Sequence, residues 1–557
     1  MKFKVDETAT KLRGGYYTPA DVARFLTKWV LGRDPRTILE PSCGDGAFIR
    51  ALEKQTNHEV NLTGVEINPE EAQKSILAAN GLPWLKTQVI TTDFLSFALE
   101  RLLAGTTFEG ALGNPPYIRY QYLEPQSQIL SQRIFSRHDL PFTKHTNAWV
   151  PFVIASIDLL APTGRLAMIV PSELLHVLHA GSLRTHLLNE CSRILIIDPS
   201  ELLFESALQG TVLLLAEKAS HSPRNKSRIA ITSIGSQEFL KRDPEELFER
   251  ADFVNGETLH GKWMKLLLRA GEIDILEACE KNSFVHRFHE LAKVDVGIVT
   301  GANGFFLVNE RTVQENGLEE FARPMFGRSE HCPGVIYNKS THERNIELGY
   351  PTSFLQFPSV PHKQLIKPAK AYIEAGEAEG IHNRYKCRIR DPWYVVPSIY
   401  ATNIGMLKRC HHFPRLILNE AKAYTTDTAY RIRVHSTHIS DERFVFNFVN
   451  SLTALTAELE GRHYGGGVLE LVPSEIEKLL VPTPQVPRVN LPNLDKQMRK
   501  MSSPEKLLGG QDAIILSGIG LDSDTISTVQ AAWNRIRRRR QRHAIEQTAD
   551  QGSINEY

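Results

Sequence analysis

The chain of 557 residues is poor in cysteine, has no long apolar run and carries almost no excess charge of one sign. Its six cysteines form no C-x-x-C pair, which excludes a disulfide framework and favours a reducing compartment such as the cytoplasm. No segment approaches the ~18 uninterrupted apolar residues of a membrane helix, and the first residues lack the apolar stretch of an export signal. We therefore expect a cytoplasmic protein that is neither exported nor inserted into a membrane.

Metal-binding spacing is lacking as well. His331-Cys332 and Cys410-His411-His412 place ligand types side by side. Adjacent side chains rarely converge on one ion unless a second cluster stands at the proper spacing. The sequence therefore predicts no metal site.

The net charge of +1 excludes a polycation that coats nucleic acid indiscriminately. The charge is unevenly distributed, because residues 361–435 hold 13 Lys and Arg against 6 Asp and Glu. A basic region on a mildly acidic chain suits a face that meets phosphates. A solvated Lys/Arg face would give the same count, so charge alone leaves both interpretations open.

What the sequence does contain is typical of a folded protein with several domains. Hydrophobic residues make up 42% and charged residues 23% of the chain, which is close to ordinary globular usage. In the first third, short apolar runs alternate with helical patterns, which predicts an α/β domain with a doubly wound, mainly parallel sheet. The expected strands include residues 37–40, 62–65, 88–90, 111–112, 166–170, 194–197 and 212–215, and the expected helices begin near 47 or cover 70–80 and 147–160.

Composition shifts predict the domain boundaries. The first domain is expected to cover residues 1–255, with the linker-like stretch 221–226 shortly before its end. Residues 256–485 are expected to form a second domain of α+β type. Residues 486–557 are expected to form a C-terminal extension with an Arg-rich tail. The expected strands of the second domain include 296–300, 393–396 and 416–418. The tail is expected either to contact phosphate or to form a frayed, solvated helix.

A nucleotide-like cofactor is indicated by the segment E-P-S-C-G-D-G at residues 40–46. It joins a strand to a helix through a turn in which Gly44 and Gly46 allow the backbone to approach a ligand. A dinucleotide fingerprint would require a third glycine, but the chain has Ile49 there, which disfavours NAD.

Carboxylates follow three of the expected strands and suggest the charge of this cofactor. Glu66 stands where a carboxylate can bind both ribose hydroxyls, although such an acid is often a helix cap or a solvated side chain. Asp93 can accept from an adenine amino group, with the Phe94 ring as an apolar wall. Together with Glu40, these acids would repel a pyrophosphate and favour a cationic, adenosine-bearing ligand, so S-adenosylmethionine fits best.

The segment Gly113-Asn114-Pro115-Pro116-Tyr117 at the end of the fourth expected strand suits an exocyclic amine. The two prolines hold the loop extended and remove backbone donors, which leaves backbone carbonyls as acceptors. If the Asn114 side-chain oxygen and the Pro115 carbonyl accept both amine hydrogens, the adenine amino nitrogen gains lone-pair character. Tyr117 then offers a stacking face. A Pro-Pro turn with a surface tyrosine is the alternative.

In their order, these motifs resemble the gamma-class adenine-N6 DNA methyltransferases of restriction-modification systems, the TaqI-type methylases. The resemblance covers most of the first 220 residues and starts at Gly15-Tyr16-Tyr17-Thr18-Pro19. It implies a fold of the S-adenosylmethionine-dependent methyltransferase type, related to the Rossmann fold, followed by a target-recognition domain. The implied cofactor residues are Tyr17, Thr18, Pro19, Glu40, Pro41, Ser42, Cys43, Gly44, Gly46, Glu66, Ile67, Asp93, Phe94 and Asn114, and the implied catalytic residues are Asn114, Pro115, Pro116, Tyr117 and Phe204.

Phe204 is assigned only by this resemblance. It falls where the family has an aromatic residue that stacks on the other face of the extruded adenine. A buried core phenylalanine is the alternative, because single aromatics are common in cores.

Three segments of the second domain resemble the recognition domains of large type II methylases: 301–306, 385–394 and 462–467. The second lies in the basic region. Alternation of Lys386, Arg388 and Arg390 predicts one face of a strand, which either contacts DNA or faces solvent at a sheet edge. The expected DNA-binding residues are Lys386, Arg388, Arg390, Trp393 and Arg462.

The resemblance implies a site-specific enzyme that transfers a methyl group from S-adenosylmethionine to N6 of a flipped-out adenine in double-stranded DNA. It leaves a cognate restriction endonuclease open as a further partner. Methylation of an RNA base or a protein glutamine amide could use the same loop, but such enzymes usually lack a long recognition domain. A modification subunit that needs a partner is a third alternative, disfavoured because one chain holds the complete cofactor and catalytic set.

Overall fold

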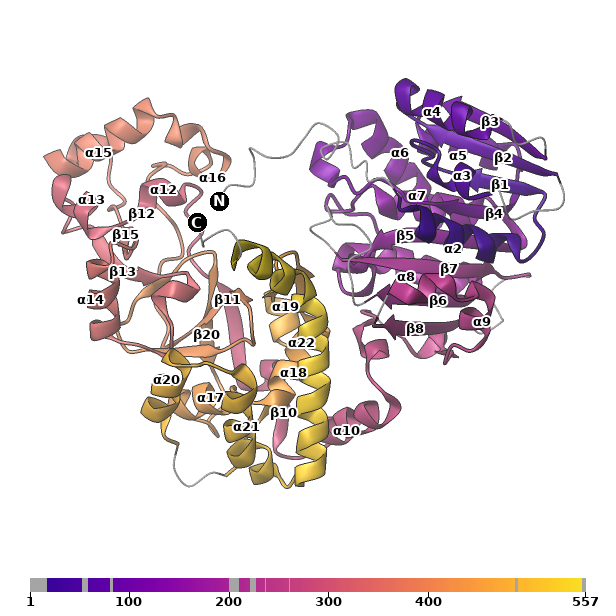
Figure 1. Ribbon diagram of the computed structural model, residues 1–557. Coiled ribbons are helices and arrows are strands. Elements are labelled where there is room, and N and C mark those ends of the chain that lie inside the picture. Colours follow the sequence, from indigo (N-terminus) through magenta and orange to yellow (C-terminus); the bar gives the residue numbers. More distant parts are fainter. Residues whose placement is uncertain are drawn as a thin grey trace. The chain divides into compact units, whose positions relative to one another are not determined.

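The computed structural model describes residues 18–552 except 53–58, 81–83, 200–209, 221–226, 236, 260 and 486–488, with only the backbone of 542–552. Figure 1 labels its helices and strands. Contacts within the chain divide it into two compact units. Unit 1 comprises Met1–Leu267 with Arg542–Tyr557, and unit 2 comprises Leu268–Gln541.

Unit 1 is built on a nine-stranded sheet in the order β3-β2-β1-β4-β5-β7-β6-β8-β9. Strands β3, β2, β1, β4 and β5 are parallel neighbours, and β7 is antiparallel to both β5 and β6. The strands are β1 Thr37–Glu40, β2 Val60–Glu66, β3 Leu85–Thr91, β4 Phe108–Gly113, β5 Leu160–Pro171, β6 Cys191–Pro199, β7 Thr211–Lys218, β8 Arg228–Ile234 and β9 Val254–Asn255. The strand order reverses between β1 and β4, and in such sheets ligands bind at the carboxyl ends of the strands near this point.

Helices form two layers that cover the sheet of unit 1 (Figure 1). One layer holds α2 Ala20–Leu31, α3 Ala47–Leu52, α4 Pro69–Ala79 and α9 Pro244–Glu249; the other holds α5 Phe94–Leu103, α6 Pro125–Ser136, α7 Trp149–Asp158 and α8 Gly181–Glu190. Local sequence fixes where these helices start: the Asn68 side chain accepts from Glu70 N and Glu71 N, and Pro69 occupies the first turn of α4. The doubly wound α/β class predicted from the sequence is confirmed, as are its seven expected strands and three expected helices.

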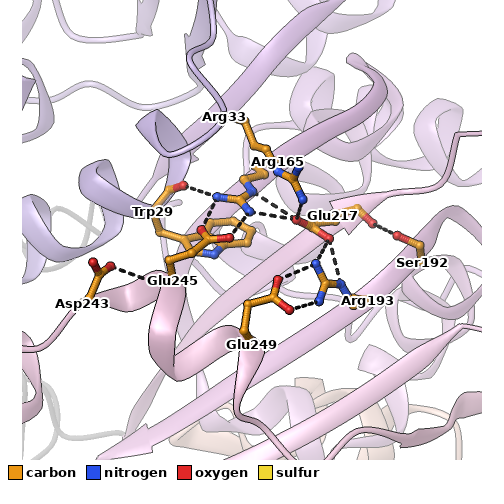
Figure 2. Close-up of polar contacts among 9 residues, drawn as sticks. All are labelled: Trp29, Arg33, Arg165, Ser192, Arg193, Glu217, Asp243, Glu245 and Glu249. Atoms are coloured by element: carbon orange, nitrogen blue, oxygen red, sulfur yellow. Dashed lines mark hydrogen bonds and ion pairs between the residues drawn. The ribbon is translucent and has the colours of Figure 1, made fainter. Parts of the chain in front are cut away.

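Charged residues are buried at the amino end of β5, opposite the edge where the site lies (Figure 2). The Arg165 side chain is fully buried and binds Glu217 Oε1 at 3.0 Å, Glu245 Oε2 at 2.6 Å and the Trp29 carbonyl at 2.8 Å. Arg193 binds the other Glu217 oxygen at 2.8 Å. This network joins α2, β5, β6, β7 and α9 through paired charges, as burial of an ion requires.

Unit 2 contains four small sheets with helices around them. The sheets are β11-β20-β16-β18-β14, β12-β15-β13-β19, β17-β22-β21 and β10-β23. Their strands are β10 Val285–Arg287, β11 Ala292–Val296, β12 Leu307–Val308, β13 Ala322–Phe326, β14 Ile336–Tyr337, β15 Ser353–Leu355, β16 Ile404–Leu407, β17 Arg409–Cys410, β18 Leu416–Asn419, β19 Tyr424–Thr425, β20 Ala429–Val434, β21 Arg462–Tyr464, β22 Val468–Glu470 and β23 Leu480–Pro482. The mixture matches the α+β class expected for this part of the chain.

The helices of unit 2 range from single turns to one long helix near the end of the chain. They are α10 Ala270–Glu280, α11 Phe288–Leu291, α12 Asn303–Phe306, α13 Glu310–Glu315, α14 Lys339–Glu347, α15 Lys367–Ala378, α16 Tyr385–Arg388, α17 Asp441–Asn447, α18 Ser451–Glu460, α19 Pro473–Ile476, α20 Leu491–Arg499, α21 Pro504–Ile515 and α22 Ser523–Gly552. No described helix is both long enough and apolar enough to cross a membrane.

Two expected strands of unit 2 differ in the structure. The run 416–418 forms part of β18, but 296–300 is a strand only at its first residue. Residues 393–394 form a turn, and 395–396 are irregular. Trp393 and Tyr394 are instead held in an aromatic cluster with Phe305 and Phe357. Apolar side chains therefore pack there without a strand, which alternation alone does not reveal.

The described part of the Arg-rich tail is packed in unit 2 at Arg537 and Arg540, whereas Arg538 is exposed. Arg540 on α22 is buried, binds Glu458 Oε1 at 2.6 Å and donates to the carbonyls of His411 and Gly467. Arg535 binds Glu272 at 2.5 Å. Up to Gln541, α22 thus belongs to unit 2, and the contacts divide the chain after Leu267. The domain boundary near 255 stays a prediction.

Candidate active site

The glycine turn after β1 places backbone donors and acceptors at the carboxyl edge of the sheet. Gly44 and Gly46 both have positive φ, of 51° and 84°. A Cβ at residue 46 would lie 2.9 Å from that of Ala78, so only glycine allows α4 to approach the turn this closely. Ser75 on α4, which sequence reasoning missed, donates to the Gly44 carbonyl at 2.9 Å.

Glu66 at the end of β2 is bound to the same turn. One carboxylate oxygen accepts from Gly44 N at 3.0 Å and the other from Asn68 N at 2.9 Å. The next side chain, Ile67, is 66% exposed at the edge of the sheet. Exposure is unusual for a large aliphatic residue and leaves Ile67 free to contact a ligand beside the turn.

Glu40 is the most unusual ionisable group of this edge. Its side chain is buried, and Oε2 has no hydrogen-bond partner within the described part of the chain. Burial, together with the charges of Asp45 and Glu66, raises the pKa of Glu40 well above its usual value. A buried carboxylate beside two further acids attracts a cation, as the sequence predicts for a sulfonium-bearing cofactor.

Cys43 lies inside this turn with its side chain buried. Burial and the neighbouring Glu40 raise the pKa of its thiol, so it remains protonated and poorly nucleophilic. Its backbone N–H donates to the Val65 carbonyl at 3.0 Å, which ties the turn to β2. Cys43 therefore shapes the turn through its backbone.

Asp93 and Phe94 follow β3 but have structural partners. The Asp93 carboxylate caps α5 by accepting from Ser96 N at 3.1 Å, and its other oxygen accepts from Ser127 Oγ at 3.0 Å. Phe94 is buried, with its ring centroid 4.9 Å from that of Phe152. Each carboxylate oxygen retains a second lone pair, so Asp93 can still accept from a ligand.

The Asn-Pro-Pro-Tyr loop follows β4 and is held directly against the glycine turn. Ser42 Oγ donates to the Asn114 carbonyl at 3.0 Å, and Asn114 Nδ2 donates to Thr18 Oγ1 at 3.4 Å. A Cβ on Gly113 would lie 3.2 Å from the Pro41 ring. Residues 18, 41–42 and 114, which lie far apart in the sequence, thus meet at one point.

Tyr117 is anchored beyond the two prolines. Its hydroxyl donates to the Ile169 carbonyl on β5 at 3.1 Å, and its side chain is half-buried. The hydrogen bond fixes the ring where the sequence places a stacking face. Pro115 is buried and Pro116 half-buried.

Two predicted site residues, Tyr17 and Phe204, lie outside the described residues. Their assignments remain predictions from the family resemblance. Of the other predicted residues in unit 1, the structure brings Thr18, Pro41, Ser42 and Asn114 into contact and joins Gly44 to Glu66. Pro19 caps the first turn of α2 next to Thr18.

The basic candidates of unit 2 fall into two groups. Lys386 and Arg388 are exposed, and each lies near the ring of Tyr385, at 5.6 and 5.7 Å from its centroid. They lie on the helical turn α16, so the expected strand face is wrong. A helical turn places both charges beside one exposed aromatic ring, an arrangement that suits phosphate and base contacts.

The remaining candidates of unit 2 have internal partners. Arg390 donates to the carbonyls of Val299 and Thr300, each at 2.7 Å. Trp393 Nε1 donates to Glu377 at 2.8 Å, and Arg462 binds the buried Glu475 at 3.0 Å. Arg390 therefore joins the segment 385–394 to the two residues that precede the segment 301–306.

Comparison with known proteins agrees with this geometry. The family described as N-6 DNA Methylase matches residues 3–266, and the family described as the C-terminal domain of the type II methyltransferase M.Eco57I matches residues 260–516. The chain is 23% identical over 500 residues to the type II methyltransferase M.AccI of Acinetobacter calcoaceticus, which covers 86% of each chain. It is 22% identical over 489 residues to M.XamI of Xanthomonas campestris pv. amaranthicola, covering 84% of this chain and 85% of the relative.

A solved structure shares the fold. The Type IIL restriction-modification enzyme MmeI, in complex with DNA, aligns with a TM-score of 0.56 at 11% identity, over 95% of this chain and 80% of MmeI. Together, a family match to each unit and relatives along most of the chain confirm the function expected from the Asn-Pro-Pro-Tyr loop and the glycine turn. The chain is similar to the N-6 DNA methylases over residues 3–266, and it is an adenine-specific DNA methyltransferase of a type II restriction-modification system.

Proposed function

We propose that unit 1 binds S-adenosylmethionine at the glycine turn and holds the target adenine in the Asn-Pro-Pro-Tyr loop, while unit 2 contacts double-stranded DNA. Methionine and ribose ends of the cofactor lie against Glu40, the 41–46 turn and Glu66, and its adenine lies beside Ile67 and Asp93. Thr18 and Pro19 border the same site, and the resemblance adds Tyr17. The order of these motifs, with the recognition unit last, supports the gamma class.

The charge of the site supports a cationic cofactor. Glu40 Oε2 is buried without a hydrogen-bond partner within the described part of the chain, and Asp45 and Glu66 add negative potential. A cation or a donor close to Glu40 would offset this cost, because burying an unpaired charge is expensive. S-adenosylmethionine would supply there a methyl group activated by a sulfonium.

The loop chemistry is positioning rather than covalent catalysis. Asn114 Oδ1 and the Pro115 carbonyl accept the two hydrogens of the adenine amine, so its nitrogen lone pair is directed away from the loop. Tyr117 stacks on the base, and Phe204 is assigned to its other face by resemblance. Orientation of this kind contributes several kcal/mol to a barrier, and stacking of about 1 to 3 kcal/mol per base offsets much of the cost of base flipping.

One observation carries the proposal: the hydrogen bond from Ser42 Oγ to the Asn114 carbonyl, with Asn114 Nδ2 bonded to Thr18. It joins the turn assigned to the methyl donor and the loop assigned to the acceptor. The alternatives, an RNA base or a protein amide as substrate, would use the same joined site. They leave unit 2, whose sequence matches a type II methyltransferase domain, without a role.

Asn114→Ala tests the loop assignment. It should lower methyl transfer to DNA at least ~100-fold, since it removes an orienting acceptor, while cofactor affinity changes little. Asn80→Ala, an exposed asparagine that ends α4, is the matched control. The measurements are transfer of labelled methyl groups to DNA, sequencing that reports N6-methyladenine at base resolution, and calorimetric titration with S-adenosylmethionine. Activity above a tenth of wild type, or modification at a base other than adenine, would contradict the proposal.

A further inference from the structure

Two histidines and two carboxylates meet in unit 1 at the edge opposite the active site. Asp158 ends α7 directly before β5 begins, and Glu190 ends α8 directly before β6 begins. His186 lies on α8, one turn before Glu190, and His138 follows α6. All four belong to helix ends at the amino edge of the sheet, whereas the glycine turn and the Asn-Pro-Pro-Tyr loop lie at the carboxyl edge.

The ligand atoms of this group are close together. One atom each of His138, His186 and Glu190 lie within 4.8 Å of one another, and no other group of three His, Cys, Asp or Glu residues does so in the described part of the chain. His186 is buried, and His138 and Glu190 are half-buried. The pairs named from the sequence, His331-Cys332 and Cys410-His411-His412, are not among such groups.

Asp158 contacts both imidazole rings, one through each carboxylate oxygen. His138 Nε2 lies 2.8 Å from Oδ2 and His186 Nε2 lies 3.0 Å from Oδ1. The His186 pair is at contact distance but lacks the alignment of a hydrogen bond. An ionised carboxylate only accepts, so His138 Nε2 carries the hydrogen of its bond to Asp158, and Nδ1 of the neutral His138 ring keeps its lone pair. Histidines that ligate metals commonly have this arrangement, with a carboxylate holding the nitrogen that faces away from the ion.

Two carboxylates and the ammonium of Lys218 set the charge of the cluster. Both carboxylates stand at helix C-termini, where the helix dipole already adds negative potential and an acid is unfavourable. Lys218 Nζ offsets this at α7, where it donates to the carbonyls of Ile157 and Leu160 at 2.8 and 2.9 Å.

We propose that His138, His186 and Glu190 bind one divalent cation of the zinc class, with Asp158 orienting both rings. Two imidazoles and a carboxylate form a ligand set that zinc accepts, with water in the fourth position. Tetrahedral zinc brings its donors to about 3.3 Å from one another, given bonds of about 2.0 to 2.1 Å. The half-buried side chains of His138 and Glu190 can rotate to reach this separation. The ion would tie the segment after α6 to α8, far from the glycine turn, so we assign it a structural role.

Metal titration of the full chain, purified without a histidine tag and stripped with chelator, tests this site. We expect one Zn²⁺ per chain by calorimetry and one Co²⁺ with the visible absorption of a tetrahedral complex. Zn²⁺ should also raise the melting temperature. His138→Gln should weaken Zn²⁺ affinity at least ~100-fold, and Asp158→Asn about 10- to 100-fold, as changes beside a metal ligand do.

Two further variants keep the test decisive. Glu190→Gln alters a half-buried side chain and should weaken binding without loss of folding, which circular dichroism checks. His145→Gln removes an exposed histidine outside the cluster and should bind Zn²⁺ as wild type does. Absence of stoichiometric binding, or equal affinity in His138→Gln and wild type, would overturn the proposal. Methylation without added metal is compatible with a structural ion and does not enter the test.

Discussion

We expect the protonation of the buried Glu40 carboxylate to be coupled to cofactor binding. Burial and the acids at 45 and 66 raise its pKa in the free protein. A cation bound beside it favours the ionised form and lowers that pKa again. Binding of S-adenosylmethionine should therefore release a proton, and affinity should rise with pH through the range between the two pKa values.

The Glu40 prediction is checked by calorimetry in buffers of different ionisation enthalpy. Wild type should release part of a proton on binding at a pH between these two pKa values, and Glu40→Gln should release none. The variant should also bind more weakly and lose the rise of affinity with pH. Arg50 interacts with Asp45 at 2.6 Å, so Arg50→Gln serves as a control that alters a nearby charge. Proton release unchanged in Glu40→Gln would refute the coupling.

At the scale of elements, the network of Figure 2 makes the sheet of unit 1 sensitive to acid. Burial alone would raise the pKa of Glu217, but Arg193 and Arg165 outweigh it and lower the pKa. The stability from this pairing is present above the unfolded pKa of about 4.3 and is lost as pH falls through the lower folded pKa.

Glu217→Gln should therefore flatten the acid limb of the stability curve. At neutral pH the variant should lower the free energy of unfolding by about 3 to 5 kcal/mol, because it leaves the buried Arg165 with one charge partner fewer. Glu249→Gln removes a half-exposed partner of Arg193 and should cost about 1 kcal/mol or less. Urea unfolding from pH 3 to 8 measures both, and equal costs would contradict the account.

The exposed charges of the helical turn α16 predict how strongly the DNA affinity depends on salt concentration. Lys386→Ala with Arg388→Ala removes two exposed charges and should reduce the slope of log affinity against log salt by about 1.8, near 0.9 per phosphate contact. Lys339→Ala with Arg311→Ala removes two exposed charges elsewhere in unit 2 and should leave the slope unchanged. Fluorescence anisotropy at several salt concentrations distinguishes the two pairs.

Sequence alone predicted the sheet of unit 1 well because local signals agreed there. Apolar strands end at polar residues, and glycines mark the turn, so Glu40, Glu66 and Asn114 could be placed at one edge. The bond between Ser42 and Asn114 and the bond between Ser127 and Asp93 could not be predicted, because each joins residues distant in sequence. In unit 2, the alternation of basic residues at 386–390 suggested a strand. The segment instead contains the helical turn α16, and Arg390 binds carbonyls of Val299 and Thr300, which lie far upstream in the sequence.

At the scale of the whole molecule, two compact units predict two unfolding transitions. Glu458 and Arg540 are both fully buried, and Glu458 holds a pKa of about 2, since its bonds to Arg540 and His463 outweigh burial. Glu458→Gln should lower the free energy of unfolding of unit 2 by about 3 to 5 kcal/mol. Glu460→Gln, two residues on, should have little effect.

Calorimetric scans with and without S-adenosylmethionine assign these transitions. The cofactor should raise only the transition temperature of unit 1, since a ligand stabilises the state that binds it. Glu458→Gln should lower only the transition temperature of unit 2. A single transition that both changes shift together would show that the units unfold as one.

The ion pair between Glu458 and Arg540 also orders events during synthesis. Every strand of the nine-stranded sheet precedes residue 256, so this sheet can form while the ribosome still translates the rest at ~5 to 20 residues per second. The core of unit 2 closes only after Arg540 has left the exit tunnel. A nascent chain can thus hold the folded sheet of unit 1 while unit 2 is still incomplete.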